Sequence, residues 1–144
     1  MYLFNRSITV NVRSVDGKIL SVDGFFLDSH HEFCLTLGVD LVSNTIVSAE
    51  CESRRVPHSD CELSKNKIEK LIGVDLNQHV RRQIRAAIGS EQGCTHLTDL
   101  ALECIKGVIQ AKFRLRRMNM QAENDIMIQQ YLAGTCQHYK RSYD

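Results

Sequence analysis

The sequence contains no tryptophan, a single proline and no apolar run near the length of a membrane-spanning helix, which is about 18 residues or more. With four tyrosines and five phenylalanines among 144 residues, the chain offers few rings for stacking on nucleic-acid bases. The formal net charge is +1, so no overall electrostatic field attracts nucleic acid or a membrane surface. We therefore expect neither a nucleic-acid partner nor a membrane, whereas a protein partner stays open.

A secretory signal is also missing, because the first residues lack a basic segment followed by an apolar one. Without export, the six cysteines face a reducing compartment, where metal ligation, redox chemistry and core packing are commoner than disulfides. The sequence therefore predicts a cytoplasmic protein. Its length and its 43% hydrophobic content predict a single domain over residues 1–144 with a core of its own.

The first half of the chain, about residues 6–52, has the alternation of apolar and polar residues that strands show. The alternating runs cover residues 8–13, 19–28, 33–41 and 47–51. Asp16-Gly17 and Ser43-Asn44 supply turn residues between the runs. Consecutive strands joined by short turns predict an antiparallel meander of about four strands with one covered face.

The second half, about residues 60–133, has helical periodicity and is separated from the first half by Pro57. Ser59 followed three residues later by Glu62 predicts a capping box before a short helix that ends at Gly73. Apolar residues at steps of three and four then predict helices over about residues 77–88, 97–117 and 122–132. The predicted fold class is α+β, with the meander packed against three to four helices.

Cysteines and histidines lie close together in the sequence more often than chance would place them. Four of the six cysteines have a histidine within three residues, namely His31 with Cys34, His58 with Cys61, Cys94 with His96, and Cys136 with His138. Thiolate and imidazole are good donors to borderline-soft metals such as zinc and iron. No C-x-x-C pair is present, so the pattern predicts a metal site without a familiar zinc motif.

The stretch Gly93-Cys94-Thr95-His96-Leu97 carries the most information about a site. Gly93 permits a turn, and Thr95 is expected to cap the helix that follows. Cys94 then lies at the helix N-terminus, where free N–H groups and the helix dipole lower the pKa of a thiol. A thiolate there would bind a metal or attack an electrophile, whereas the alternative role is a small buried hydrophobe beside the cap.

The remaining cysteines and histidines divide into different settings. Cys61 lies at the start of a predicted helix, in a setting like that of Cys94. Cys51 and Cys104 lie on apolar faces and are predicted to fill the core. His79 stands among three arginines on a predicted helix face that we expect to be solvated.

The motif Gly93-Cys94-Thr95-His96-Leu97-Thr98-Asp99-Leu100 resembles a bacterial family of uncharacterised domains, catalogued as a domain of unknown function. The resemblance extends over most of the chain, through the strands ending at Asp28, His31-Glu32-Phe33, Val56-Pro57, Leu71-Ile72-Gly73 and a late cysteine that matches Cys136. This resemblance implies that Cys61, Cys94, His96 and Cys136 belong to one site together with His31. It implies no established activity.

A fainter likeness links the chain to the iron–sulfur scaffold proteins, which have a small sheet packed on helices. In that group a Gly-Cys step opens a long central helix, and three cysteines from distant segments meet. Gly93-Cys94 matches the step, and Cys61 and Cys136 are the two further cysteines that the likeness implies. The Cys-Gly-Asp turn of that group is absent here, and the order of elements differs.

The sequence thus favours a metal-binding domain in which Cys61, Cys94, His96 and Cys136 hold one zinc or iron ion, with His31 as a fifth ligand or a neighbour. A closed ligand set would be structural, and an open one would suit catalysis or transfer of a metal or cluster. A second hypothesis is a thiol-dependent enzyme with Cys94 as nucleophile and His96 or His31 as base. A third is a metal-free interaction module with incidental cysteines.

Overall fold

The protein is described here by a computed structural model of residues 1–91, 93–118 and 122–141. Contacts within the chain define two compact units, Met1–Val108 and Ile109–Asp144. The first unit contains the sheet, the helices that cover it and most of the predicted site residues. Among the described residues, no helix is long and apolar enough to cross a membrane.

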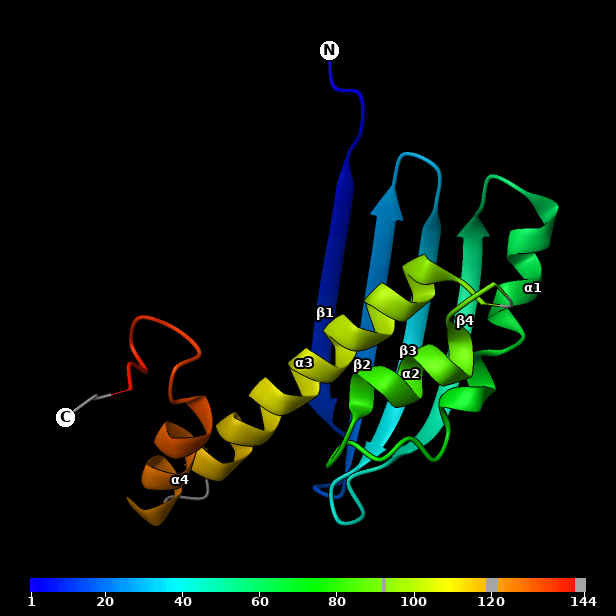
Figure 1. Ribbon diagram of the computed structural model, residues 1–144. Coiled ribbons are helices and arrows are strands. Elements are labelled where there is room, and N and C mark those ends of the chain that lie inside the picture. The colour runs from blue at the N-terminus through cyan, green and yellow to red at the C-terminus, as the bar shows by residue number, and fades with distance from the viewer. Residues whose placement is uncertain (92, 119–121, 142–144) are drawn as a thin grey trace. The chain divides into compact units, whose positions relative to one another are not determined.

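Four strands form one antiparallel meander in the order β1-β2-β3-β4, as the alternation predicts (Figure 1). The strands are β1 (Arg6–Ser14), β2 (Ile19–Asp28), β3 (Glu32–Asp40) and β4 (Ile46–Arg55). Two of the turns contain residues with positive φ, Gly17 at 77° and Asn44 at 58°, which glycine and asparagine tolerate better than most residues do. The α+β prediction with an N-terminal meander is therefore confirmed.

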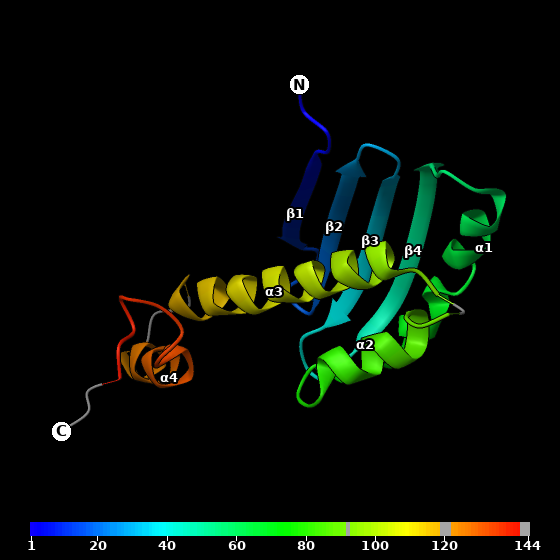
Figure 2. The ribbon, with the colours of Figure 1, turned by 45° about the horizontal axis from the view of Figure 1, so that its top comes forward.

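One face of the sheet forms the core. The inward side chains of β2 and β3, which include Leu20, Val22, Phe26, Phe33 and Leu37, are each at most 1% exposed. Helices α2 (Val80–Ile88) and α3 (Thr95–Met118) cross this face (Figures 1 and 2). The opposite face has exposed side chains in the middle of its strands, among them Thr9, Phe25 and Thr36.

Helix α3 lies close to the sheet because glycines provide the space. A Cβ atom at Gly24 of β2 would collide with the thiol of Cys104 and would lie 3.0 Å from a methyl carbon of Leu100. A Cβ atom at Gly107 of α3 would lie 2.8 Å from Val10. These contacts pack α3, from Leu100 to Gly107, closely against the middle of β1 and β2, where Val10 and Gly24 pair in register.

The helical half differs from the prediction near its beginning. The first predicted helix is divided into three short pieces, η1 (Ser59–Cys61), α1 (Glu62–Lys65) and η2 (Ile68–Leu71). The prediction of a capping box between Ser59 and Glu62 is wrong. The Ser59 hydroxyl contacts Asp60, and Glu62 accepts a hydrogen bond from Ser53 of β4. Helix α2 begins at Val80, after His79 in the left-handed region (φ 48°, ψ 30°).

The second unit consists of the end of α3 and helix α4 (Ala122–Leu132), whose bounds agree with the prediction. Phe113 of α3 and Tyr131 of α4 meet edge to face, with ring centroids 5.3 Å apart. Ile128 of α4 is 1% exposed. Gly134 follows at a φ of 79°, which suits the end of a helix.

Candidate functional site

Asp28 is a carboxylate in a position of the sheet that is otherwise apolar. Along β2 the residues Leu20, Val22, Gly24, Phe26 and Asp28 alternate onto the covered face, and all five are buried. The side chain of Asp28 is 1% exposed, although carboxylates are seldom buried without specific partners. Its position at the end of the strand brings it beside the turn into β3 and beside the start of α3.

One oxygen of the Asp28 carboxylate is satisfied by its own turn. Oδ1 accepts hydrogen bonds from the backbone N–H groups of His30 (2.8 Å) and His31 (2.7 Å), and it lies 2.9 Å from Nδ1 of the His31 ring. The Arg55 guanidinium donates to the backbone carbonyls of Asp28 and Ser29, each at 2.8 Å. These bonds hold the turn and fix the His31 ring relative to the carboxylate.

The second oxygen faces residues from other elements. Oδ2 lies 3.8 Å from Nε2 of His96, at the start of α3, and 3.6 Å from the Arg6 guanidinium of β1. Arg6 also lies over the ring of Phe26, 4.9 Å from its centroid. The Asp28 carboxylate therefore connects three elements: its own turn, β1 and α3.

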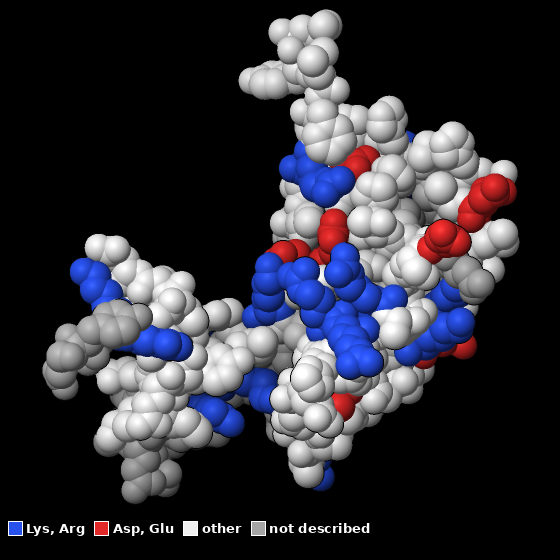
Figure 3. Space-filling model, viewed as in Figure 1, with Lys and Arg blue, Asp and Glu red and all other residues white. Residues whose placement is uncertain are grey.

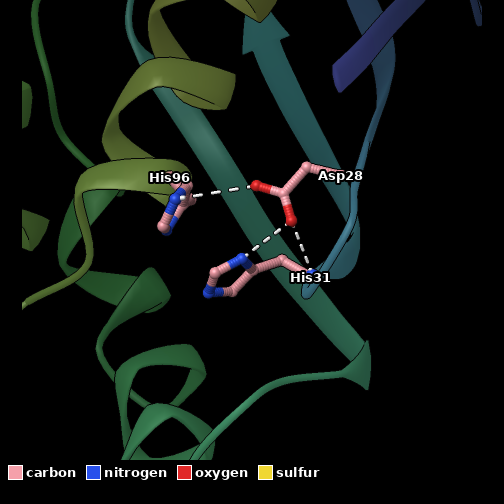
Figure 4. A group of neighbouring side chains, drawn as sticks. All are labelled: Asp28, His31 and His96. Atoms are coloured by element: carbon pink, nitrogen blue, oxygen red, sulfur yellow. Dashed lines mark hydrogen bonds and ion pairs between the residues drawn. The ribbon is translucent and has the colours of Figure 1, made fainter. Parts of the chain in front are cut away.

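The two imidazoles complete a compact cluster with this carboxylate (Figure 4). Their centroids are 3.9 Å apart with planes inclined at 33°. One ligand atom from each of Asp28, His31 and His96 lies within 4.8 Å of the other two. The side chain of His31 is 12% exposed and that of His96 is 28% exposed, so the cluster reaches solvent on the His96 side.

The ionisation of these groups follows from burial and hydrogen bonding. Burial opposes the charge on Asp28 and would raise its pKa. Hydrogen bonds from the backbone N–H of His30, and from the side chain and backbone N–H of His31, outweigh burial and lower the pKa of the carboxyl well below its usual range. Burial and the charge of His31 lower the pKa of His96, against the smaller opposite effect of Asp28. A permanent carboxylate thus faces an imidazole that favours its neutral form, which is the form that binds metals.

Cys94 lies on the far edge of the His96 ring. Its sulfur is 3.9 Å from Nδ1, whereas Nε2 of the same ring faces Asp28. The sulfur also accepts hydrogen bonds from the backbone N–H groups of Leu97 and His96. Cys94 therefore takes the N-cap position that was predicted for Thr95. Burial outweighs these donors and raises the pKa of the Cys94 thiol, in contrast to the lowered pKa that its helix end predicts.

The structure joins two of the five predicted site residues, His31 and His96, in one cluster with Asp28, and a third, Cys94, contacts the His96 ring outside this cluster. Within the described part of the chain, no cysteine belongs to the cluster of mutually close ligand atoms. Cys61 is half-buried and close enough to Cys94 for their charges to interact. Cys136 is exposed and belongs to the second unit. The roles of Cys61, Cys94 and Cys136 as ligands stay predictions.

The sequence analysis missed Asp28, although the sequence contains a signal for it. Asp28 continues the period-two series of β2 that places Val22 and Phe26 in the core, so the same pattern predicts a buried carboxylate. A buried carboxylate needs partners, and the nearby His31 is an obvious one. Asp28 resembled an ordinary turn residue because aspartate is common where strands end.

Two further cysteines, Cys104 and Cys51, are packed in or beside the core. Cys104 is 0% exposed under Gly24, as predicted for a core residue, and burial raises the pKa of its thiol to about 12. Cys51 is half-buried on the covered face of β4, where burial raises the pKa of its thiol to about 12. Both thiols are held in the protonated form at neutral pH.

Comparison with known proteins gives a match to one family model. Residues 4–110 match the model of a family described as a protein of unknown function, DUF2889. These residues include the whole Asp28–His31–His96 cluster and Cys94, whereas Cys136 lies outside them. No curated protein matches the chain. No solved structure matches it either.

Proposed function

The chain belongs to this family of unknown function, and from the geometry of its buried cluster we propose that it is a metal-binding domain. Asp28, His31 and His96 would hold one zinc or iron(II) ion. The observation that supports this most strongly is the juxtaposition of two imidazoles and a carboxylate from two distant segments, with their ligand atoms within 4.8 Å of one another.

The donor types fit these ions. Zinc and iron bind imidazole nitrogen and carboxylate oxygen, at about 2.0–2.2 Å for zinc. Ligand atoms around such an ion are about 3–3.5 Å apart, so small rotations of the three side chains would suffice to form the site. The ionised Asp28 supplies the negative charge that a divalent ion needs, and the lowered pKa of His96 favours the neutral ligand.

The number of ligands bears on the role of the site. Three protein ligands leave at least one coordination position for water or a substrate, which is typical of catalytic zinc and of iron oxygenase centres rather than of structural zinc. The partial exposure of His96 leaves a route for such a molecule. We therefore favour catalysis or metal transfer over a structural role, with Cys94 as the outer partner of the His96 ring.

The test is elemental analysis of the untagged protein, purified with and without oxygen, followed by titration of the metal-free protein with zinc and cobalt(II). We expect about one ion per chain, held by the wild type and lost from His31→Ala and His96→Ala. Loss of an outer-shell partner lowers metal affinity about 10- to 100-fold, and loss of a direct ligand is expected to lower it further.

His30→Ala is the matched control, because His30 is exposed and adjacent to His31, and its contact with Asp28 is made by the backbone. It should bind zinc as the wild type does. A wild type that remains metal-free under both conditions and binds neither ion would overturn the proposal. Equal losses in His30→Ala and His31→Ala would also overturn it, because they would reflect surface histidines rather than the cluster.

The hypothesis of a thiol-dependent enzyme is favoured by one specific observation. The His96 ring lies between the Cys94 sulfur, 3.9 Å from Nδ1, and the Asp28 carboxylate, 3.8 Å from Nε2. This is the order of nucleophile, base and orienting acid in a triad. The raised pKa of Cys94 and the lowered pKa of His96 oppose a thiolate–imidazolium pair, so we rank this candidate second.

Cys94→Ser separates the two candidates. In a metal site where Cys94 is an outer partner, this variant would keep the ion with affinity lowered about 10- to 100-fold at most. In a thiol enzyme, wild-type protein without metal would react at Cys94 with an electrophile such as iodoacetamide, and His96→Ala would slow that reaction. Metal binding with slow alkylation supports the first candidate, and rapid alkylation without metal supports the second.

We also propose that the protein works in a reducing compartment, the cytoplasm. The support for this is that each of its six cysteines carries a free thiol.

A further inference from the structure

Helix α2 has a basic face that forms no ion pair with the described residues. Arg81, Arg82 and Arg85 are exposed, and within residues 1–91, 93–118 and 122–141 no carboxylate pairs with any of them. The other cations near the sheet contrast with this, since Arg6, Arg13 and Arg54 each face a carboxylate. Three uncompensated guanidinium groups on nine helical residues are a concentrated charge in a protein of net charge +1.

The helix geometry places these three side chains together. Successive residues of a helix are rotated by about 100°, so Arg85 projects between Arg81 and Arg82 on one side of α2. Ile84 and Ile88 are buried and lie beside this arginine side of the helix, next to Arg81, so they mark its inner border. The arginines are therefore free to face solvent, and Figure 3 shows lysine and arginine side chains gathered over the face on which α2 lies.

The surface beside these arginines has two shallow, open depressions. One hollow is lined by His79, Val80 and the three arginines, and an adjoining one by Gln78, His79, Arg82, Gln83 and Ala86. His79 precedes the helix in the left-handed region and makes no capping hydrogen bond with its side chain. Guanidinium donors and side-chain amides thus border two neighbouring depressions that share His79 and Arg82.

We propose that this basic face of α2, defined by His79, Arg81, Arg82 and Arg85, is a docking surface for an acidic segment of a partner protein. Carboxylates of that segment would pair with the guanidinium groups, whose planar forks match carboxylate geometry. Two adjoining hollows suit an extended segment with several acidic side chains better than a single small anion. None of these residues belongs to the Asp28–His31–His96 cluster, so the surface is independent of the proposed metal site.

An acidic protein segment fits this face better than nucleic acid does. The residues that line the hollows include no phenylalanine or tyrosine, so bases would find no ring to stack on apart from the imidazole of His79. The charge is confined to one helix about 14 Å long, whereas nucleic-acid binding proteins typically neutralise a longer track of phosphates.

The experiment measures binding of a fluorescent twelve-residue peptide of glutamate, aspartate and glycine to the full chain by anisotropy, at several salt concentrations. Single-stranded and duplex DNA oligonucleotides are measured in parallel. The test variant is Arg81→Gln, Arg82→Gln, Arg85→Gln. Its matched control, Arg13→Gln, Lys18→Gln, Arg54→Gln, removes the same charge from the strands and turns. Circular dichroism confirms that both variants are folded.

We expect the wild type to bind the peptide more tightly than either DNA. The α2 variant should lose about tenfold or more in affinity, because three exposed ion pairs with the peptide are lost and each contributes modestly. The control should change less than about twofold, because its three residues lie outside the proposed surface. Equal weakening in the two triple variants would overturn the proposal, as would a wild type that does not bind the peptide at low salt. Tighter binding of DNA through the same arginines would also overturn it and identify a nucleic-acid surface.

Discussion

The imidazole rings of His31 and His96 lie with their centroids 3.9 Å apart and their planes inclined at 33°, although one ring comes from the turn after β2 and the other from the first turn of α3. Burial and the nearby charge of His31 lower the pKa of His96. The Asp28 carboxylate lies beside both rings and supplies negative charge. A divalent cation would bind to the same three groups, the two imidazoles and the carboxylate.

Acidification should destabilise the metal-free protein in two stages. The folded-state pKa of His96 lies below its ordinary value of 6.5, so below about pH 6.5 the unfolded chain binds more protons and stability falls. The folded-state pKa of Asp28 lies below its ordinary value of 3.8, so a further loss follows as the pH drops below about 4. Urea midpoints measured between pH 8 and pH 3 would follow both stages.

His96→Gln isolates the first stage. In this variant the decline between about pH 7 and pH 5 should flatten while the decline below about pH 4 remains. A decline of unchanged size in the upper range would show that another group is responsible.

Asp28→Ala should cost more stability than Asp28→Asn. Alanine removes the acceptor of the His30 and His31 N–H groups and leaves these part-buried donors without it, which predicts a loss of about 1–3 kcal/mol in the free energy of unfolding. Asparagine retains an acceptor oxygen and should cost less, although it lacks the charge that a metal would need. Equal destabilisation by the two variants in urea unfolding would contradict the assigned hydrogen bonds.

Gly24→Ala should destabilise the first unit by about 1–3 kcal/mol, since the new methyl group would overlap the thiol of Cys104. Cys104→Ala removes that thiol and should make the same change at Gly24 cheaper. A double-mutant cycle by chemical denaturation therefore predicts a coupling energy of about 0.5–3 kcal/mol. Additive effects of the two substitutions would show that α3 moves away from the sheet at little cost.

A chain that ends after Lys112 should fold and bind metal with unchanged affinity. Unit Met1–Val108 contains the sheet, its covering helices and all three residues of the cluster, and four further residues protect the last turn of the truncated helix. Circular dichroism and zinc titration of this shortened protein provide the measurement. A folded but metal-free product would indicate that Cys136, as the sequence predicted, contributes to the site.

Alkylation by iodoacetamide at pH 7.5 should reach Cys136 first, Cys94 later and Cys104 last. Cys136 is exposed, whereas burial raises the pKa of the Cys94 thiol and raises that of Cys104 to about 12, so few of their thiolates form. Peptide mass spectrometry of a time course gives the order. Faster reaction of Cys94 than of Cys136 would favour the thiol-enzyme candidate over the metal site.

The sequence predicted regular elements well and three-dimensional proximity less well. The meander and α3 followed from periodicity, because burial of one face imposes a repeat that is visible locally. The break between α1 and η2 was missed, since it depends on packing against β4 and on Ser53, which binds Glu62. His31 and His96 were placed in one site by the family resemblance and their neighbouring cysteines, but the structure joins them through Asp28, a partner that no spacing rule pairs with His96.

The two oxygens of Asp28 also separate early from late events in folding. Oδ1 bonds to residues two and three positions along its own turn, contacts that a β2–β3 hairpin can form in microseconds. Oδ2 faces His96, which arrives only when α3 docks, a contact of high sequence separation that pays loop-closure entropy first. The hairpin can thus present two of the three proposed ligands, Asp28 and His31, before the tertiary fold exists. A metal ion captured at that stage would act as a nucleus that recruits α3, which would make folding speed depend on metal supply.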